Sequence, residues 1–107
     1  MSREILLLVD ALAHEKNVSR EVIFTALELA LASATKKKHD TGVDIKVEID
    51  QETGEYKTFR CWTILPEDEI ENKNAEITLN DEKSKNKSIN DVIKESIPSV
   101  EFGRIGA

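Results

Sequence analysis

Apolar and charged residues alternate strictly from Val43 to Asp50, and this alternation limits the fold more than any other feature of the chain. Four aliphatic residues are each separated by one charged residue: Val43, Ile45, Val47 and Ile49. A period of two places all four on one face of a β-strand, whereas a helix would spread them around its axis. Gly54 closes the polar turn 50–54, where a hairpin of this length needs a left-handed residue. The stretch 43–65 therefore predicts a β-hairpin with one buried face.

The second strand of this hairpin carries two aromatic residues, Phe59 and Trp62, an odd number of positions apart. Without a bulge, such residues lie on opposite faces of a sheet. One of the two is therefore expected on a second, partly covered face. Pro66 ends the strand, and the acidic stretch 67–74 follows as a connector.

Two amphipathic segments precede the hairpin and predict helices over about 3–16 and 20–37. In the first helix, the expected core face consists of Ile5, Leu8, Val9 and Leu12. In the second helix, the expected core face consists of Ile23, Leu27, Ala30, Leu31 and Ala34, with Phe24 and Ala26 at its edges. Asn17 suits the left-handed position that ends a helix, and Ser19 is a good N-cap for the next one. A link this short predicts an antiparallel helical hairpin.

Short and mostly polar elements are expected after the hairpin. The stretch 75–79 suits an edge strand, and Thr78 suits the cap of a brief helix through residues 81–82. A polar loop follows over 83–88. The stretch 90–97 fits either a strand or a helical turn.

The last residues suggest that this is one domain of a larger protein. Ser99, after Pro98, is expected to begin a helix, but only about two turns follow before residue 107. A helix that short is marginal alone. We therefore expect a domain over 1–98 and the start of a truncated linker helix over 99–107. The expected fold class is α+β, with an N-terminal helical hairpin packed against a small, mostly antiparallel sheet.

Composition argues against several classes of protein. The chain has 107 residues, a formal net charge of −6 and a single cysteine, Cys61, which has no partner for a disulfide. The apolar run 5–9 is too short to span a bilayer and lacks the flanks of a secretory signal. His14 and His39 are far apart, and no catalytic motif or metal-ligand spacing occurs. We expect a cytoplasmic protein without membrane contact, enzyme activity, metal or cofactor.

Lys36, Lys37 and Lys38 end the second helix and are the main candidates for a functional surface. Successive helical residues turn by about 100°, so the three side chains fan around the axis. Because charged groups on the core side would be costly, the helix end is expected to protrude as a positive lysine collar. Three interpretations are open: a solvated end that suits the helix dipole, a contact to phosphates, or a contact to an acidic protein.

Leu7 and Leu29 raise a second question, because both fall near the polar side of their helices. One interpretation is that they pack beneath the sheet. The other is that they help to form an apolar groove for a partner helix. The sequence does not separate the two.

Four segments, in this order, resemble one bacterial family: REILLLVDALAHEKNVSREVIFTALELALASATKKK, VDIKVEIDQETGEYKTFRCW, AEITL and VEFGRI. Together they resemble the N-terminal domain of the transcription elongation factor NusA. The resemblance covers nearly the whole chain. Its most specific parts are E-x-I-F-x-A-L-E-x-A-L-A-x-A-x-K-K-K and the closing F-G-R-I.

This resemblance implies a non-enzymatic domain that binds RNA polymerase near the RNA exit channel. In the family the domain contacts the flap-tip helix of the β subunit and meets the C-terminal domain of an α subunit. It promotes pausing, intrinsic termination and antitermination by favouring the nascent RNA hairpin. The family's residues that are implicated in contacting this RNA correspond to Lys36, Lys37, Lys38 and Arg104. The resemblance therefore implies RNA as an auxiliary contact, and a monomeric domain is expected. The alternative is a protein–protein interaction module without RNA contact.

Overall fold

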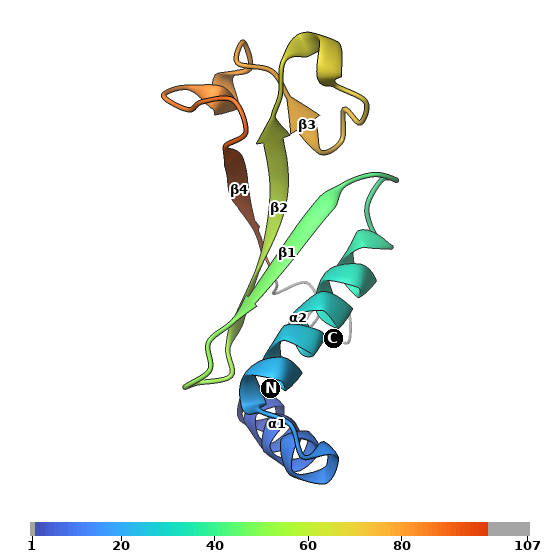
Figure 1. Ribbon diagram of the computed structural model, residues 1–107, viewed down its shortest axis with the longest axis vertical. Coiled ribbons are helices and arrows are strands. Elements are labelled where there is room, and N and C mark those ends of the chain that lie inside the picture. Colours follow the sequence, from blue (N-terminus) through green and yellow to red (C-terminus); the bar gives the residue numbers. More distant parts are fainter. Residues whose placement is uncertain (1, 99–107) are drawn as a thin grey trace.

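The computed structural model describes residues 2–98. Two helices come first, α1 (Ser2–Lys16) and α2 (Arg20–Lys36) (Figure 1). The remaining elements are, in chain order, β1 (Asp44–Ile49), β2 (Tyr56–Ile64), the 3₁₀ turn η1 (Glu67–Glu69), β3 (Glu76–Ile77), the 3₁₀ turn η2 (Glu82–Ser84) and β4 (Val92–Ile97). This is the predicted α+β fold, and the stretch 90–97, which fitted two structures, contains a strand.

The strand β2 lies at the centre of a four-stranded sheet. β1 pairs antiparallel with residues 56–61 of β2, and β4 pairs antiparallel with residues 58–63 along the other edge. β3 pairs parallel with Thr63 and Ile64. Because β4 already occupies one edge at Thr63, β3 continues the edge that β1 leaves beyond Cys61. The sheet is mostly antiparallel, as predicted.

The register of β1 and β2 decides which residues face the helices. Val47 lies opposite Thr58 and Lys46 opposite Phe59, so Thr58 faces the core and Phe59 the outer face. No bulge interrupts the pairing between Phe59 and Trp62, so Trp62 lies on the side of Thr58. Trp62 is buried and Phe59 is half-buried. The predicted division of the two aromatic residues between opposite faces is confirmed.

The core lies between the two helices and one face of β1. Nine buried residues form it: Val9, Ala13, Ile23, Phe24, Ala32, Val43, Ile45, Val47 and Ile49. All four aliphatic residues of the alternating stretch belong to this core, as their period predicts. Glu28 helps to set the rotation of α2, because its carboxylate accepts a hydrogen bond of 2.9 Å from the backbone N–H of Ile49.

The core faces of the helices differ from those expected. Ala30 and Ala34 are exposed, whereas Phe24 and Ala32 are buried. On α1, Leu8 is also exposed. An alanine-rich helix is apolar on several sides, so its periodicity does not select one of them. Packing against β1 makes that selection.

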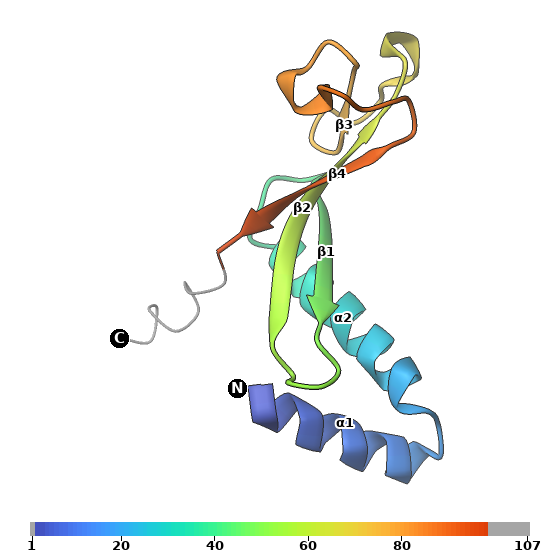
Figure 2. The same ribbon diagram turned by 90° about the vertical axis from the view of Figure 1, so that its left-hand side faces the viewer.

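The link between the helices has the predicted local structure. Asn17 takes a left-handed conformation with φ 53°, and the Ser19 hydroxyl accepts a hydrogen bond of 3.3 Å from the backbone N–H of Val22. The expected antiparallel arrangement is wrong: from this turn the helices diverge at an open angle, with α2 running up along the hairpin and α1 crossing below its tip (Figure 2). The tip and α1 touch at Gly54, where an added Cβ would lie 2.0 Å from the Ser2 carbonyl oxygen.

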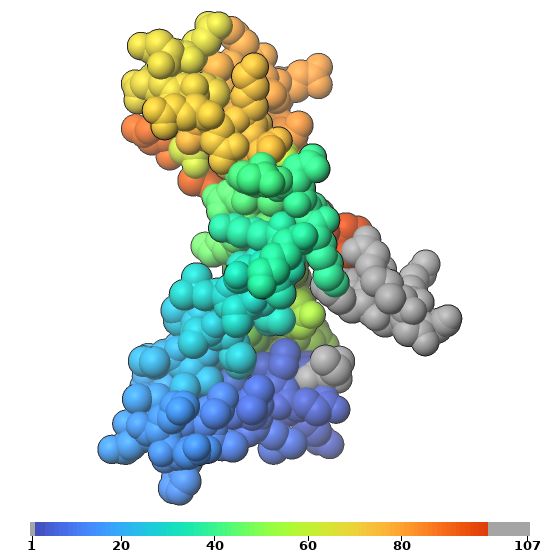
Figure 3. Space-filling view, turned by 90° about the vertical axis from the view of Figure 1, so that its right-hand side faces the viewer, coloured from blue at the N-terminus to red at the C-terminus, as the bar shows by residue number. Residues whose placement is uncertain are grey.

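Residues 65–91 form a distal lobe beyond the ends of β1 and α2, and Figure 3 shows the narrower region that joins it to the helical part. The edge strand expected over 75–79 is only the two residues of β3. The predicted Thr78 cap is wrong, because Asp81 caps η2 by accepting a hydrogen bond of 2.9 Å from the Lys83 N–H. Thr78 instead accepts a 2.6 Å hydrogen bond at its carbonyl from the Ser84 hydroxyl. The expected helix start at Ser99 and the linker helix over 99–107 lie outside the described residues.

We predict that Gly54→Ala destabilises the fold by at least about 2 kcal/mol. Gly54 has φ 80°, which strains any residue with a Cβ, and the Ser2 backbone leaves no space for one. Urea unfolding followed by circular dichroism measures the change. Gln51→Ala in the same exposed turn is the control and is expected to have a small effect. Equal stability of Gly54→Ala and the wild type would contradict this account of the turn.

Candidate interaction surfaces

The lysine collar, residues 36–38, lies at the transition from α2 to the loop before β1. Lys36 is the last residue of α2 and Lys37 is its C-cap. The chain then turns tightly, with the N–H of Lys38 donating to the Thr35 carbonyl at 3.0 Å and that of His39 to the Lys36 carbonyl at 3.1 Å. All three lysines are exposed. The structure thus places the collar at a protruding helix end.

Two asparagines of the distal lobe hold the loop that follows the collar. The Asn74 side chain donates to the Thr41 carbonyl at 2.6 Å, and the Asn72 side chain donates to the Gly42 carbonyl at 2.7 Å. Arg60 in turn donates from Nη2 to the Asn74 carbonyl at 3.1 Å. These contacts tie the helix end to β2, and the sequence analysis did not identify them. The two asparagine contacts join residues 30 and 33 positions apart and the Arg60 contact residues 14 apart, so no local sequence pattern predicts them.

Leu7 and Leu29 both point away from the core, at 63% and 66% exposure. The interpretation that they pack beneath the sheet is therefore wrong. They lie on different helices, and the structure gives each its own exposed apolar site. Whether the two serve one partner stays a prediction.

Leu29 belongs to a set of exposed residues that repeats every seven positions on α2. Val22, Leu29 and Lys36 are about two helical turns apart and share one face, which we name the outer stripe. Val22 is 55% exposed, so two of the three positions offer apolar surface. One side of α2 therefore presents aliphatic side chains that lead directly to the lysine collar.

The described residues contain no arrangement suited to metal binding, because no group of three or more His, Cys, Asp or Glu side chains could hold an ion there. A hollow of about 520 Å³ beside η1 and β3 includes carboxylates of Glu67, Glu76 and Asp81. Backbone N–H groups of Glu71 and Asn72 donate to the Glu76 carboxylate at 2.9 Å each and lower its pKa. Glu76 therefore serves to hold this loop. None of the described helices is long and apolar enough to cross a membrane.

Comparisons with known proteins agree on one family. The family model described as the NusA N-terminal domain matches residues 4–107. The chain belongs to the NusA N-terminal domain family. Its relatives include the transcription termination/antitermination proteins NusA of Rickettsia conorii and Rickettsia prowazekii, each 33% identical over 106 residues. These matches cover 97% of this chain and 21% of each relative, so the chain spans about one fifth of their length.

A solved structure of a relative confirms the fold. The solution structure of the N-terminal domain of NusA from B. subtilis matches with a TM-score of 0.70 and 30% sequence identity. The match covers 98% of this chain and 85% of the other. The family resemblance recognised in the sequence is confirmed. Arg104, which that resemblance implies as an RNA contact, lies outside the described residues.

Charged and aromatic side chains meet on the outer face of the sheet. The Lys94 ammonium donates to the Glu48 carboxylate at 2.6 Å and also lies 4.7 Å from the centre of the Phe59 ring. The hydrogen bond from Lys94 is the main reason that the pKa of Glu48 is lowered. Beside them Cys61 is only 3% exposed. Burial raises the pKa of the Cys61 thiol, and the Asp44 carboxylate adds to that effect.

We predict that Cys61 reacts slowly with a thiol reagent while the NusA domain is folded. The thiolate is the reactive form, and a raised pKa together with burial suppresses both its population and its accessibility. The rate of modification by an aromatic disulfide at about pH 8 is expected to fall at least about tenfold below that of the urea-unfolded chain. Equal rates in the two states would show that the outer face does not protect this thiol.

Proposed function

We propose that this chain is a non-enzymatic domain of a transcription elongation factor that docks on RNA polymerase near the RNA exit channel. Its partners there are the flap tip of the β subunit and the C-terminal domain of an α subunit. It promotes pausing, intrinsic termination and antitermination by stabilising nascent RNA hairpins. The domain comprises residues 1–98, acts as a cytoplasmic monomer, and residues 99–107 begin a linker to further domains.

The observation that carries this proposal is the outer stripe of α2 leading into the lysine collar. Docking on a protein requires apolar surface that is exposed before binding, and Val22, Leu29 and Leu7 supply it. Burial of one leucine side chain contributes about 1.5–3 kcal/mol. A few such residues are enough to hold a small domain on a large partner.

RNA contact is the second part of the proposal. Lys36, Lys37 and Lys38 add charge at the exposed end of the docking helix, and Arg104 adds a further positive charge. A change of about 1.4 kcal/mol in the stability of a paused state alters its lifetime tenfold. A few charge-assisted contacts supply energies of this size. The RNA contact is therefore auxiliary to docking.

A protein–protein module without RNA contact is the second candidate. The observation that favours it is the chain's net charge of −6, which opposes binding of a polyanion. In that case the lysine collar meets an acidic surface of polymerase. Changing the sequence and length of the RNA hairpin while the polymerase stays the same separates the two candidates, because only an RNA contact responds.

The triple variant K36A/K37A/K38A is predicted to shorten hairpin-stabilised pauses severalfold while polymerase binding persists. It removes the proposed phosphate contacts but leaves Val22 and Leu29 of the outer stripe unchanged. A hairpin-pause transcription assay at moderate salt measures the effect. The control K36R/K37R/K38R keeps the charge and is expected to retain most of the activity. Unchanged pausing by the alanine variant would rule out the RNA contact.

Leu29→Ser is predicted to weaken binding to polymerase about tenfold, the equivalent of about 1.4 kcal/mol. The side chain is largely exposed in the free domain, so its loss removes docking surface without opening a cavity. Leu79→Ser is the matched control, because Leu79 is 49% exposed but lies on the distal lobe. Fluorescence anisotropy with labelled domain and core polymerase gives both affinities. Equal losses for the two variants would place the docking surface elsewhere.

A further inference from the structure

Two consecutive tight turns shape the polar loop of the distal lobe. In the first, the Lys87 N–H donates to the Ser84 carbonyl at 2.9 Å, Lys85 has φ −56° and ψ 127°, and Asn86 has φ 64°. These angles are those of a type II turn with an asparagine at the left-handed position. In the second, the Asp91 N–H donates to the Ser88 carbonyl at 3.0 Å.

Both turns are anchored to the body of the domain. Ser84 is only 2% exposed and donates its hydroxyl to the Thr78 carbonyl at 2.6 Å. At the other end, the Asn90 N–H donates to the Ile64 carbonyl at 2.7 Å, and the Ile64 N–H donates to the Asp91 carbonyl at 3.0 Å. The backbone between Ser84 and Asp91 is therefore fixed before any partner arrives, which lowers the entropic cost of binding.

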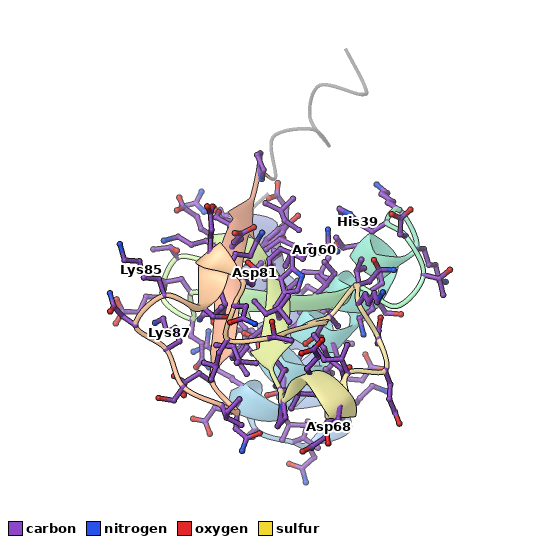
Figure 4. All side chains as sticks on the ribbon, turned by 90° about the horizontal axis from the view of Figure 1, so that it is seen from above. His39, Arg60, Asp68, Asp81, Lys85 and Lys87 are labelled. Atoms are coloured by element: carbon purple, nitrogen blue, oxygen red, sulfur yellow. The ribbon has the colours of Figure 1, made fainter. Side chains whose placement is uncertain are left out.

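Lys85 and Lys87 occupy two of the three exposed positions of the first turn and point outward from the lobe (Figure 4). Neither forms an ion pair with another residue in the range 2–98. Lys83 differs from them, because its ammonium lies 5.1 Å from the centre of the Trp62 ring. Two lysines thus project on a rigid turn without a carboxylate partner.

Charge is distributed unevenly along the part of the chain that forms the lobe. Residues 65–82 hold seven acidic residues and one lysine, a net charge of −6 that equals that of the whole chain. The other residues hold 14 acidic and 14 basic side chains and are neutral overall. Asp68 of the acidic segment projects from a different side of the lobe than the two lysines, whereas Asp81, near the other end of the segment, lies next to the turn (Figure 4). The two lysines therefore lie away from the Asp68 end of the acidic segment, although Asp81 is near them.

We propose that Lys85 and Lys87 form a second RNA-phosphate contact, separate from the lysine collar. The two residues span at most about 7 Å of chain, and a nucleic acid strand carries one charge per about 3.4 Å of helix axis. The pair therefore contacts neighbouring phosphates without reading bases. His39 next to the collar lies on the other side of the molecule in the same view, so the two contacts take different segments of RNA (Figure 4). The proposal rests on the proposed function, because that function brings RNA to the domain.

The test uses the 107-residue chain, which corresponds to a domain solved in isolation in a relative. The probe is a single-stranded RNA of about 16 nucleotides, followed by amide NMR shifts and by affinity between about 50 and 200 mM salt. We expect shifts at residues 84–88 in the wild type. In K85A/K87A, the slope of log affinity against log salt is expected to decrease by about 1.4, because two phosphate contacts are lost.

The variant K16A/K57A is the matched control, because it removes the same charge from exposed lysines outside the loop. It is expected to keep the wild-type salt slope, and K85R/K87R is expected to restore it. Equal slopes for K85A/K87A and K16A/K57A, or no shift at residues 84–88, would overturn the inference. Shifts at residues 35–39 alone would support the collar and reject the loop. Shifts at residues 84–88 alone would support the loop and reject the collar.

Discussion

The backbone pairing of β2 along both of its edges is the interaction on which the rest of the structure depends. Its nine residues bond to β1 and β3 along one edge and to β4 along the other. The lower part of β2 lies in the helical region, while Thr63 and Ile64 reach the distal lobe (Figure 1). The backbone of the buried Ile64 also accepts a hydrogen bond from the Asn90 N–H and donates one to the Asp91 carbonyl. One strand therefore sets the position of the helices, with the outer stripe, relative to the lobe.

Alternation was a sufficient guide to the sheet because a strand has only two faces. The period of two in β1 fixed its buried side, and the odd spacing of Phe59 and Trp62 placed them on opposite sides. Helical faces were harder to predict. In α2, alanines surround much of the axis, so several orientations bury a similar amount of apolar surface. The hydrogen bond from Ile49 to Glu28 helps to decide among them, and it joins residues 21 positions apart.

For the candidate surfaces, too, some features could be predicted from the sequence and others could not. A protruding lysine collar followed from the sequence, because three charged residues that fan around a helix axis cannot lie over a core. The wheel positions of Leu7 and Leu29 left two interpretations, and their exposure in the structure removed one. The Asn72 and Asn74 contacts that hold the loop after the collar could not be predicted, because each depends on how the lobe folds back onto residues 41–42. The turn that carries Lys85 could not be predicted for the same reason, because its anchoring hydrogen bonds join it to Thr78 and Ile64.

In the proposed function, docking over Val22 and Leu29 is physically coupled to an RNA contact at Lys36. Leu29 and Lys36 are seven positions apart on one helix face, a separation of about 10 Å along the axis. That is close to the Debye length of about 8 Å at physiological salt. A partner seated over Leu29 displaces water and mobile ions near Lys36, which lowers the local dielectric and reduces screening. On that proposal, the same lysine attracts a phosphate more strongly in the docked domain than in the free one. The gain requires no structural change in the domain, because the helix already holds the two residues in line.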